Sequence, residues 1–191
     1  MSHIHYDTEA FVLHGTSLGE ANRYLTLLTK EFGLLRAVGR GLRLERSKLR
    51  YCLQEGARVR VSLVRGREVW RLTGAVLLEM KEIEPERRQL LARLSFLLRR
   101  LLPGEERNES LFEIFAAAHR YILDDEKATV AALEELVVLR MLASLGYRSS
   151  SPLLSPLLDG VVIDTDALVF VRSTRQHAVA EINALLTMTE L

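Results

Sequence analysis

Eleven basic side chains lie between residues 36 and 71 of this 191-residue chain, and only three acidic ones lie among them. All but one of the eleven are arginines, whose planar guanidinium carries five N–H donors in a geometry that suits phosphate oxygens. Clustered cations also gain binding free energy by releasing the counterions condensed on a nucleic acid. The segment therefore predicts a nucleic-acid-binding surface. Its candidate contact residues are Arg36, Arg40, Arg43, Arg46, Lys48, Arg50, Arg58, Arg60, Arg65, Arg67 and Arg71.

The net charge of the whole chain, +1, hides a strong asymmetry. Residues 1–80 carry 13 Lys and Arg against 8 Asp and Glu, whereas residues 81–191 carry 13 against 17. An imbalance of this kind between two halves indicates a polyanionic partner. Three alternatives stay open at this point, one of which is that the arginines clamp the acidic second half of the same chain. The arginines could form a solvated face that keeps the protein from aggregating, or they could dock an acidic protein, which would make the chain an interaction adaptor.

Aromatic side chains that could stack on bases are scarce in the basic half of the chain. Such stacking platforms are common in proteins that bind single strands. Trp70 lies next to Arg71 and could be exposed, although a tryptophan in a β-barrel more often packs in the core. The candidates in this half are Tyr24, Phe32, Tyr51 and Trp70.

Other reactive side chains form no catalytic or metal-binding constellation. The sequence has no phosphate loop of the Walker type, no dinucleotide-binding fingerprint and no nucleophile elbow. His3 and His5 lie two residues apart without a third ligand, and Asp164 and Asp166 fall where a turn is expected. Cys52 is the one cysteine, so it can form neither an internal disulfide nor a Cys-based zinc site. We therefore expect a non-enzymatic protein without metal or cofactor.

The sequence also favours a cytoplasmic protein. No apolar run approaches the roughly 18 residues that a membrane-spanning helix needs. The first five residues lack the basic and apolar regions of a secretory signal. A single cysteine fits a reducing compartment.

Alternation of apolar and polar residues predicts five β-strands in the first 80 residues. Five short strands in this length are typical of the OB-fold, a small closed barrel. We expect Arg36 and Arg40 on one strand face, the next four basic residues on a loop, and the last five around a hairpin turn at Gly66. The predicted strands cover residues 9–14, 23–29, 34–38, 57–64 and 68–78.

The pattern changes near Pro85, after which apolar residues recur at helical spacing. Two X-Pro steps predict a loop over residues 149–158, and residues 161–171 predict a short hairpin. The chain is thus expected to be α+β, with an OB-fold domain over residues 1–80 and a mainly helical domain over residues 81–191. Helices are predicted over residues 90–102, from residue 108, over 128–145 and over 175–186.

Several motifs occur in the order found in a known family. An apolar strand precedes GEANR at residues 19–23, and residues 25–41 pair two apolar runs around Gly33 and end in GRG. A basic stretch then leads to Leu53-Gln54, and Leu145-Gly146-Tyr147 ends a helix. This order resembles the RecO family of bacterial DNA repair proteins, closely over the first 80 residues and loosely beyond.

The resemblance implies an N-terminal OB-fold, a helical domain and recombination mediation without covalent chemistry. RecO-like proteins bind single- and double-stranded DNA and anneal complementary strands. With RecR they help load RecA onto strands covered by single-strand-binding protein. The resemblance carries DNA contact over to the basic residues between Arg36 and Arg50. It also implies RecR contact in the N-terminal domain, without assigning a residue, and places the protein at the nucleoid.

The sequence departs from the family pattern at three points. Glu55 replaces the proline that usually follows Leu-Gln. Many members carry four zinc-binding cysteines just after LGY, whereas residues 148–152 here read RSSSP, so zinc is expected to be absent. The chain is also short for the family, and we expect the pocket that holds the acidic tail of single-strand-binding protein in some relatives to be altered or missing.

Overall fold

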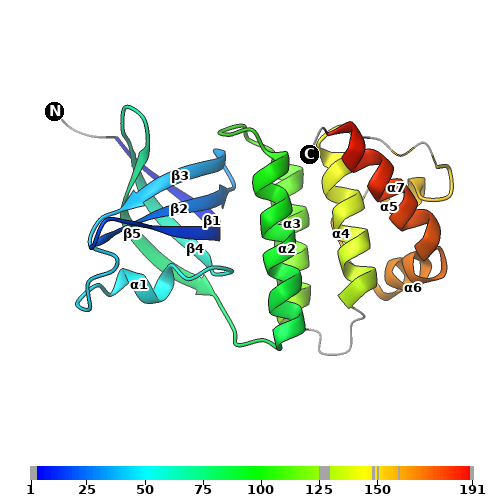
Figure 1. Ribbon diagram of the computed structural model, residues 1–191, viewed down its shortest axis with the longest axis horizontal. Helices are drawn as coiled ribbons and strands as arrows, with labels where there is room; N and C mark the ends of the chain where they lie inside the picture. The colour runs from blue at the N-terminus through cyan, green and yellow to red at the C-terminus, as the bar shows by residue number, and fades with distance from the viewer. Residues whose placement is uncertain (1–3, 125–129, 148, 150, 159, 190–191) are drawn as a thin grey trace. The chain divides into compact units, whose positions relative to one another are not determined.

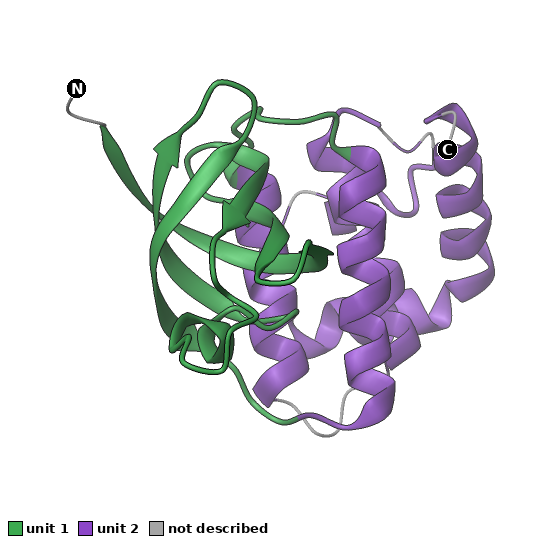
Figure 2. Cartoon of the chain, turned by 60° about the vertical axis from the view of Figure 1, so that its left-hand side comes forward, with its two compact units in different colours: residues 1–82, 102–109 green, residues 83–101, 110–191 purple. Residues whose placement is uncertain are grey.

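The computed structural model describes residues 4–124, 130–147, 149, 151–158 and 160–189. They divide into two compact units (Figure 2). The barrel unit comprises residues 1–82 and 102–109, and the helical unit comprises residues 83–101 and 110–191. The sequence predicted a single division near residue 80. The chain in fact leaves the barrel unit near that point, returns to it for eight residues and leaves it again.

The barrel unit is the five-stranded OB-fold barrel that the sequence predicted (Figure 1). Its strands follow the closed order β1-β2-β3-β5-β4, and each pair of neighbours is antiparallel except β3 and β5, which are parallel. A short helix, α1 (Leu49–Cys52), lies between β3 and β4 in sequence. The strand bounds are β1 (His5–Leu18), β2 (Asn22–Thr29), β3 (Gly33–Gly39), β4 (Arg58–Arg65) and β5 (Trp70–Glu79).

The first strand is much longer than the predicted residues 9–14. It pairs with β4 through its first half and with β2 through its second, with an irregularity between Val12 and His14. The sequence predicted a loop from Gly15 because glycine, threonine and serine follow each other there. Pairing with β2 overrides that local preference, since a strand that joins both neighbours closes the barrel.

The barrel core consists of the inward side chains of alternating residues. Val59, Val61 and Leu63 are fully buried, as their alternation predicts. Trp70 is only 2% exposed, and its ring lies 5.4 Å from that of Tyr6 and 5.2 Å from that of Phe32 between centroids. Burying large aromatic groups supplies much of the stability of so small a core. An exposed Trp70 is therefore excluded, and Phe32, which is partly buried, packs against the same core.

The helical unit is built around α4 (Val130–Ser144), which contacts α2, α5, α6 and α7. Its apolar residues surround the helix axis instead of forming one stripe, as is typical of a central buried helix. A guanidinium nitrogen of Arg87 on α2 donates to the carbonyl of Ile122 on α3 at 2.9 Å. The other bounds are α2 (Pro85–Leu101), α3 (Glu109–Asp124), α5 (Ser155–Leu158), α6 (Thr165–Ser173) and α7 (Arg175–Met188).

The hairpin predicted over residues 161–171 is wrong, because α6 occupies most of that range. The Oδ1 of Asp164 accepts a hydrogen bond from the backbone N–H of Ala167 at 2.7 Å and so caps the helix. Leu168 and Val171, three residues apart, are its buried residues. Aspartate favours turns and helix N-caps alike, so the apolar spacing after it distinguishes the two.

The loop predicted over residues 149–158 is also partly wrong. Its last four residues form α5, with Pro156 in the first turn of the helix. Proline is tolerated there because its missing N–H would have no intrahelical partner in any case. Within the described ranges, no helix is long and apolar enough to cross a membrane.

Candidate nucleic-acid interface

The basic loop, residues 40–48, connects β3 to α1 and carries most of the predicted contact residues. Arg40, Arg43, Arg46 and Lys48 are all exposed, and none of them makes an ion pair with a described residue. Glu45 is the one acidic residue in the loop. The loop therefore presents several cations whose charge no described residue neutralises.

Three hydrogen bonds fix the basic loop against the turn between β1 and β2 and the first residue of β2. The N–H of Gly41 donates to Oδ1 of Asn22 at 2.9 Å, and the N–H of Arg43 donates to the carbonyl of Ala21 at 2.9 Å. The Arg43 side chain donates to the carbonyl of Gly19 at 2.6 Å. Leu42 also fixes the loop, because its side chain is only 2% exposed and packs in the barrel core. A loop held this way loses little conformational entropy when it binds a ligand.

Arg36 and Arg71 project from the outer face of neighbouring strands. Arg36 is exposed on β3 and lies across from Thr26 on β2. Arg71 on β5 pairs in register with Val38, two residues after Arg36, and two residues along a strand restore the same face. Arg40, predicted to share the strand face of Arg36, follows the last residue of β3 and lies in the turn.

Arg58 and Arg60 on β4 are paired within the barrel. Their guanidinium groups lie 2.9 and 3.4 Å from the two carboxylate oxygens of Glu9 on β1, and Arg58 also lies 4.0 Å from Glu79. Burial alone would raise the pKa of Glu9, but the hydrogen bonds and charges of the two arginines outweigh burial and lower it. Much of the positive charge of these two residues is thus already neutralised.

The remaining predicted residues are Arg65, the last residue of β4, and Arg67, in the turn between β4 and β5. Arg65 lies 3.7 Å from the carboxylate of Glu105, which belongs to the returning segment of the barrel unit, and 5.6 Å over the ring of Trp70. Arg67 is exposed, and no described residue forms an ion pair with it. The charge of Arg65 is therefore partly offset by Glu105, whereas that of Arg67 is not offset by a described residue. Sequence composition alone does not distinguish the two arginines.

A groove of about 530 Å³ lies between the β1–β2 hairpin, the basic loop and α1; we call it the mouth groove. Three guanidinium groups line it, from Arg23, Arg43 and Arg50. Sequence reasoning placed Arg23 on a strand and missed it as a site residue. Its position at the end of the GEANR motif, directly after the turn that holds the basic loop, could have identified it as a site residue. The remaining polar or aromatic lining residues are Ser17, Tyr51 and Gln54.

Arg50 and Tyr51 form a stacked pair at the mouth groove. The guanidinium carbon of Arg50 lies 4.7 Å from the Tyr51 ring centroid, and its NH2 donates to the tyrosine hydroxyl at 2.9 Å. Tyr51 nevertheless remains 58% exposed. Of the four aromatic residues that the sequence offered for stacking, Tyr51 is the one with an exposed ring.

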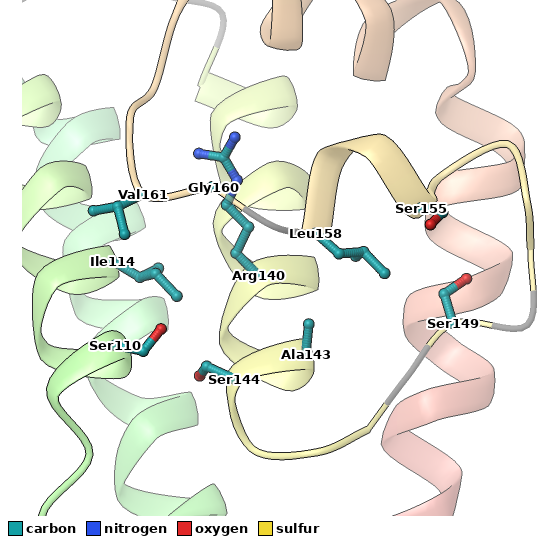
Figure 3. Close-up of a pocket in the computed structure, with 10 residues that line it drawn as sticks. All are labelled: Ser110, Ile114, Arg140, Ala143, Ser144, Ser149, Ser155, Leu158, Gly160 and Val161. Atoms are coloured by element: carbon teal, nitrogen blue, oxygen red, sulfur yellow. The ribbon is translucent and has the colours of Figure 1, made fainter.

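The helical unit contains a cavity of about 390 Å³ beside Arg140 of α4 (Figure 3). Arg140 is only 5% exposed, and its Nε and NH1 donate to the carbonyls of Leu157 and Val162 at 2.9 and 2.8 Å. Burial lowers the pKa of Arg140, against the opposing charge of Asp164. The buried guanidinium therefore connects α4 to α5 and to the segment that follows α5.

The residues considered for other chemistry stay apart. Among the described residues, no three His, Cys, Asp or Glu side chains are grouped to hold a metal ion. His3 lies outside the described residues, as do positions 148 and 150 of the stretch where relatives carry cysteines. Cys52 is half-buried, and Asp164 serves as a helix cap.

Comparison with known proteins identifies the barrel unit. The family model described as "Recombination protein O N terminal" matches residues 1–80. A DNA repair protein RecO from Pelotomaculum thermopropionicum is 31% identical over 148 residues, which cover 74% of this chain and 56% of that protein. The chain thus aligns with little more than half the length of this curated relative. The matched region contains the whole barrel and the basic loop.

Proposed function

Because this chain belongs to the RecO family, we propose that it is a DNA-binding mediator of recombinational DNA repair. We propose that it binds and anneals DNA and, with RecR, assists the loading of RecA. The tail of single-strand-binding protein is a further proposed partner, and the nucleoid is the proposed place of action. None of these roles needs a covalent step, so the protein is proposed to have no catalytic activity.

The observation that carries the proposal is the anchored basic loop. Its four exposed cations have no ion-pair partners among the described residues, and the loop begins directly after β3, the strand that carries exposed Arg36. Cations that are already desolvated and paired would have to break those pairs before they could bind phosphate, whereas these need not. Fixed, unneutralised arginines suit a polyanion whose phosphates they can neutralise.

A charge-reversal variant tests this surface. Arg40→Glu, Arg43→Glu and Arg46→Glu together should lower duplex affinity at least a hundredfold at about 0.1 M salt, because each lost phosphate contact costs roughly eightfold there. The matched control reverses three exposed arginines of the helical unit, Arg88, Arg120 and Arg172, and so changes the net charge equally. Fluorescence anisotropy with labelled DNA measures both. Equal affinity of the first variant and the parent would rule out the proposed surface.

The competing function is an adaptor whose basic face docks an acidic protein. It is separated from DNA binding by the same titration at low salt. If the parent binds no DNA there but binds RecR or single-strand-binding protein tightly, and charge reversal abolishes that binding, the adaptor replaces the mediator.

Annealing and the absence of catalysis are tested with pure protein. The parent should accelerate pairing of complementary strands, bare or coated with single-strand-binding protein, and the charge-reversed variant should not. Labelled DNA incubated with the parent and Mg²⁺ or Mn²⁺ should stay intact. Metal-dependent cleavage that disappears in a point variant would instead identify a nuclease.

A further inference from the structure

We propose that the mouth groove receives an unpaired nucleotide of single-stranded DNA, with its base on Tyr51 and its phosphate among Arg23, Arg43 and Arg50. The inference rests on the proposed function and goes beyond it, because it assigns a strand preference to one part of the surface. The groove is built entirely within the barrel unit, from β1, β2, the basic loop, α1 and the residues just after α1.

The charge of the groove selects an anion. Arg23 donates one hydrogen bond, to the carbonyl of Gly15 at 3.4 Å, and Arg43 donates one to the carbonyl of Gly19 at 2.6 Å. A guanidinium has five N–H donors, so each retains donors for a phosphate. The nearby carboxylate of Glu55 is engaged elsewhere, since it accepts from the N–H of Gly15 and lies against His14, both at 2.9 Å.

The position of Arg23 depends on the glycine beside it. A Cβ on Gly15 would lie 2.2 Å from NH2 of Arg23 and 2.8 Å from its guanidinium carbon. Any larger residue at position 15 would therefore displace the arginine from its place in the groove. Gly15 thus leaves free the space that the Arg23 guanidinium occupies.

Tyr51 supplies the surface for a base. The Arg50 guanidinium covers one part of the ring, and 58% of the residue is still exposed. Stacking of a base on an aromatic side chain contributes about 1–3 kcal/mol and tolerates any sequence, because every base has a π-face. Tyr6, Phe32 and Trp70 cannot serve in this way because they pack against one another in the core.

The pairing of a ring face with guanidinium groups favours an unpaired strand. In a duplex the base faces are covered by their neighbours, so only the phosphates and the groove edges reach a protein. An unpaired strand can place a base on Tyr51 while its phosphate meets the arginines. Duplex DNA can bring its phosphates to the arginines but cannot place a base on Tyr51. Loss of the ring should therefore affect the two forms of DNA unequally.

The test compares Tyr51→Leu with the parent on a single strand and on the duplex of the same sequence. Single-strand affinity should fall roughly 5- to 150-fold, and duplex affinity should change less than about twofold. Tyr51→Phe is the matched control and should bind single strands within about threefold of the parent, because it keeps the ring. Unchanged single-strand affinity of the leucine variant, or equal losses on both DNAs, would overturn the inference while leaving the proposed function intact.

A second measurement uses the unaltered protein. A single strand that contains 5-iodouracil is cross-linked to the parent by near-ultraviolet light, and the modified peptide is identified by mass spectrometry. The adduct should fall on Tyr51. Adducts confined to other residues would overturn the inference, and a parent that binds neither form of DNA would overturn the proposed function with it.

Discussion

At the scale of single residues, the partners of a cation decide its availability more than its place in the sequence does. Arg58 and Arg60 share the carboxylate of Glu9, whereas Arg43 and Arg46 have no acidic partner among the described residues. All four belong to one arginine-rich segment, and composition treats them alike. Only the fold brings Glu9, some fifty residues away, beside β4. The two pairs should therefore respond differently to substitution.

Single alanine variants test this difference. Arg43→Ala and Arg46→Ala should each weaken duplex binding roughly eightfold at about 0.1 M salt, since each removes one phosphate contact. Arg60→Ala should weaken it less than about twofold, because its charge is already offset by Glu9. Anisotropy titrations under one buffer condition measure all three. A loss at Arg60 as large as that at Arg43 would show that pairing does not limit availability.

Glu9 itself should make stability depend on pH. Its pKa is lowered in the folded protein, so the stability that it contributes is fully present above the unfolded pKa of about 4.3 and is lost as pH falls through the folded value. Urea unfolding of the parent should therefore show a larger loss of stability between about pH 5 and pH 3 than Glu9→Gln does. Parallel losses in the two proteins would argue against the Glu9–Arg58–Arg60 cluster.

At the scale of elements, turns hold the functional segments in place. Gly33 joins β2 to β3 with a φ of 68°, a conformation that side chains disfavour. A Cβ there would lie 2.0 Å from the carbonyl oxygen of Glu106, in the segment that returns to the barrel unit. That contact joins residues more than seventy positions apart, and no local pattern in the sequence predicts it. Conversely, the φ > 0 turn itself was predictable from the glycine between two apolar runs.

A glycine series separates backbone strain from crowding. Gly104→Ala should be nearly neutral, because φ is not positive there and no atom lies within 4 Å of its Cβ. Gly19→Ala, with a φ of 62° and open space, should cost about 1 kcal/mol. Gly33→Ala combines strain with a backbone clash and should cost at least about 2 kcal/mol. Urea unfolding gives the three values, and equal costs at Gly19 and Gly33 would contradict the contact with Glu106.

At the scale of the whole molecule, the sequence predicted the charge difference between the two units and only part of their structure. Alternation at Val59, Val61 and Leu63 predicted the barrel strands, because a half-buried strand leaves that pattern in any context. Asp164 led to the wrong prediction of a hairpin, since aspartate occurs both in turns and at helix N-caps. Arg23 was missed because its role depends on Gly15 across the β1–β2 hairpin and on Arg43 and Tyr51, which the folded barrel brings beside it. The arginine segment was found early, but its division into paired and unpaired members required the fold.

The salt dependence of duplex binding tests whether the basic loop contacts DNA phosphates. The parent is compared with a variant carrying Arg40→Ala, Arg43→Ala and Arg46→Ala, over about 0.05–0.3 M salt. If these residues contact phosphates, the slope of log affinity against log salt should become shallower by about 2.7 in the variant, at about 0.9 for each contact. Identical slopes for the two proteins would show that the basic loop neutralises no phosphate and is not the DNA-binding surface.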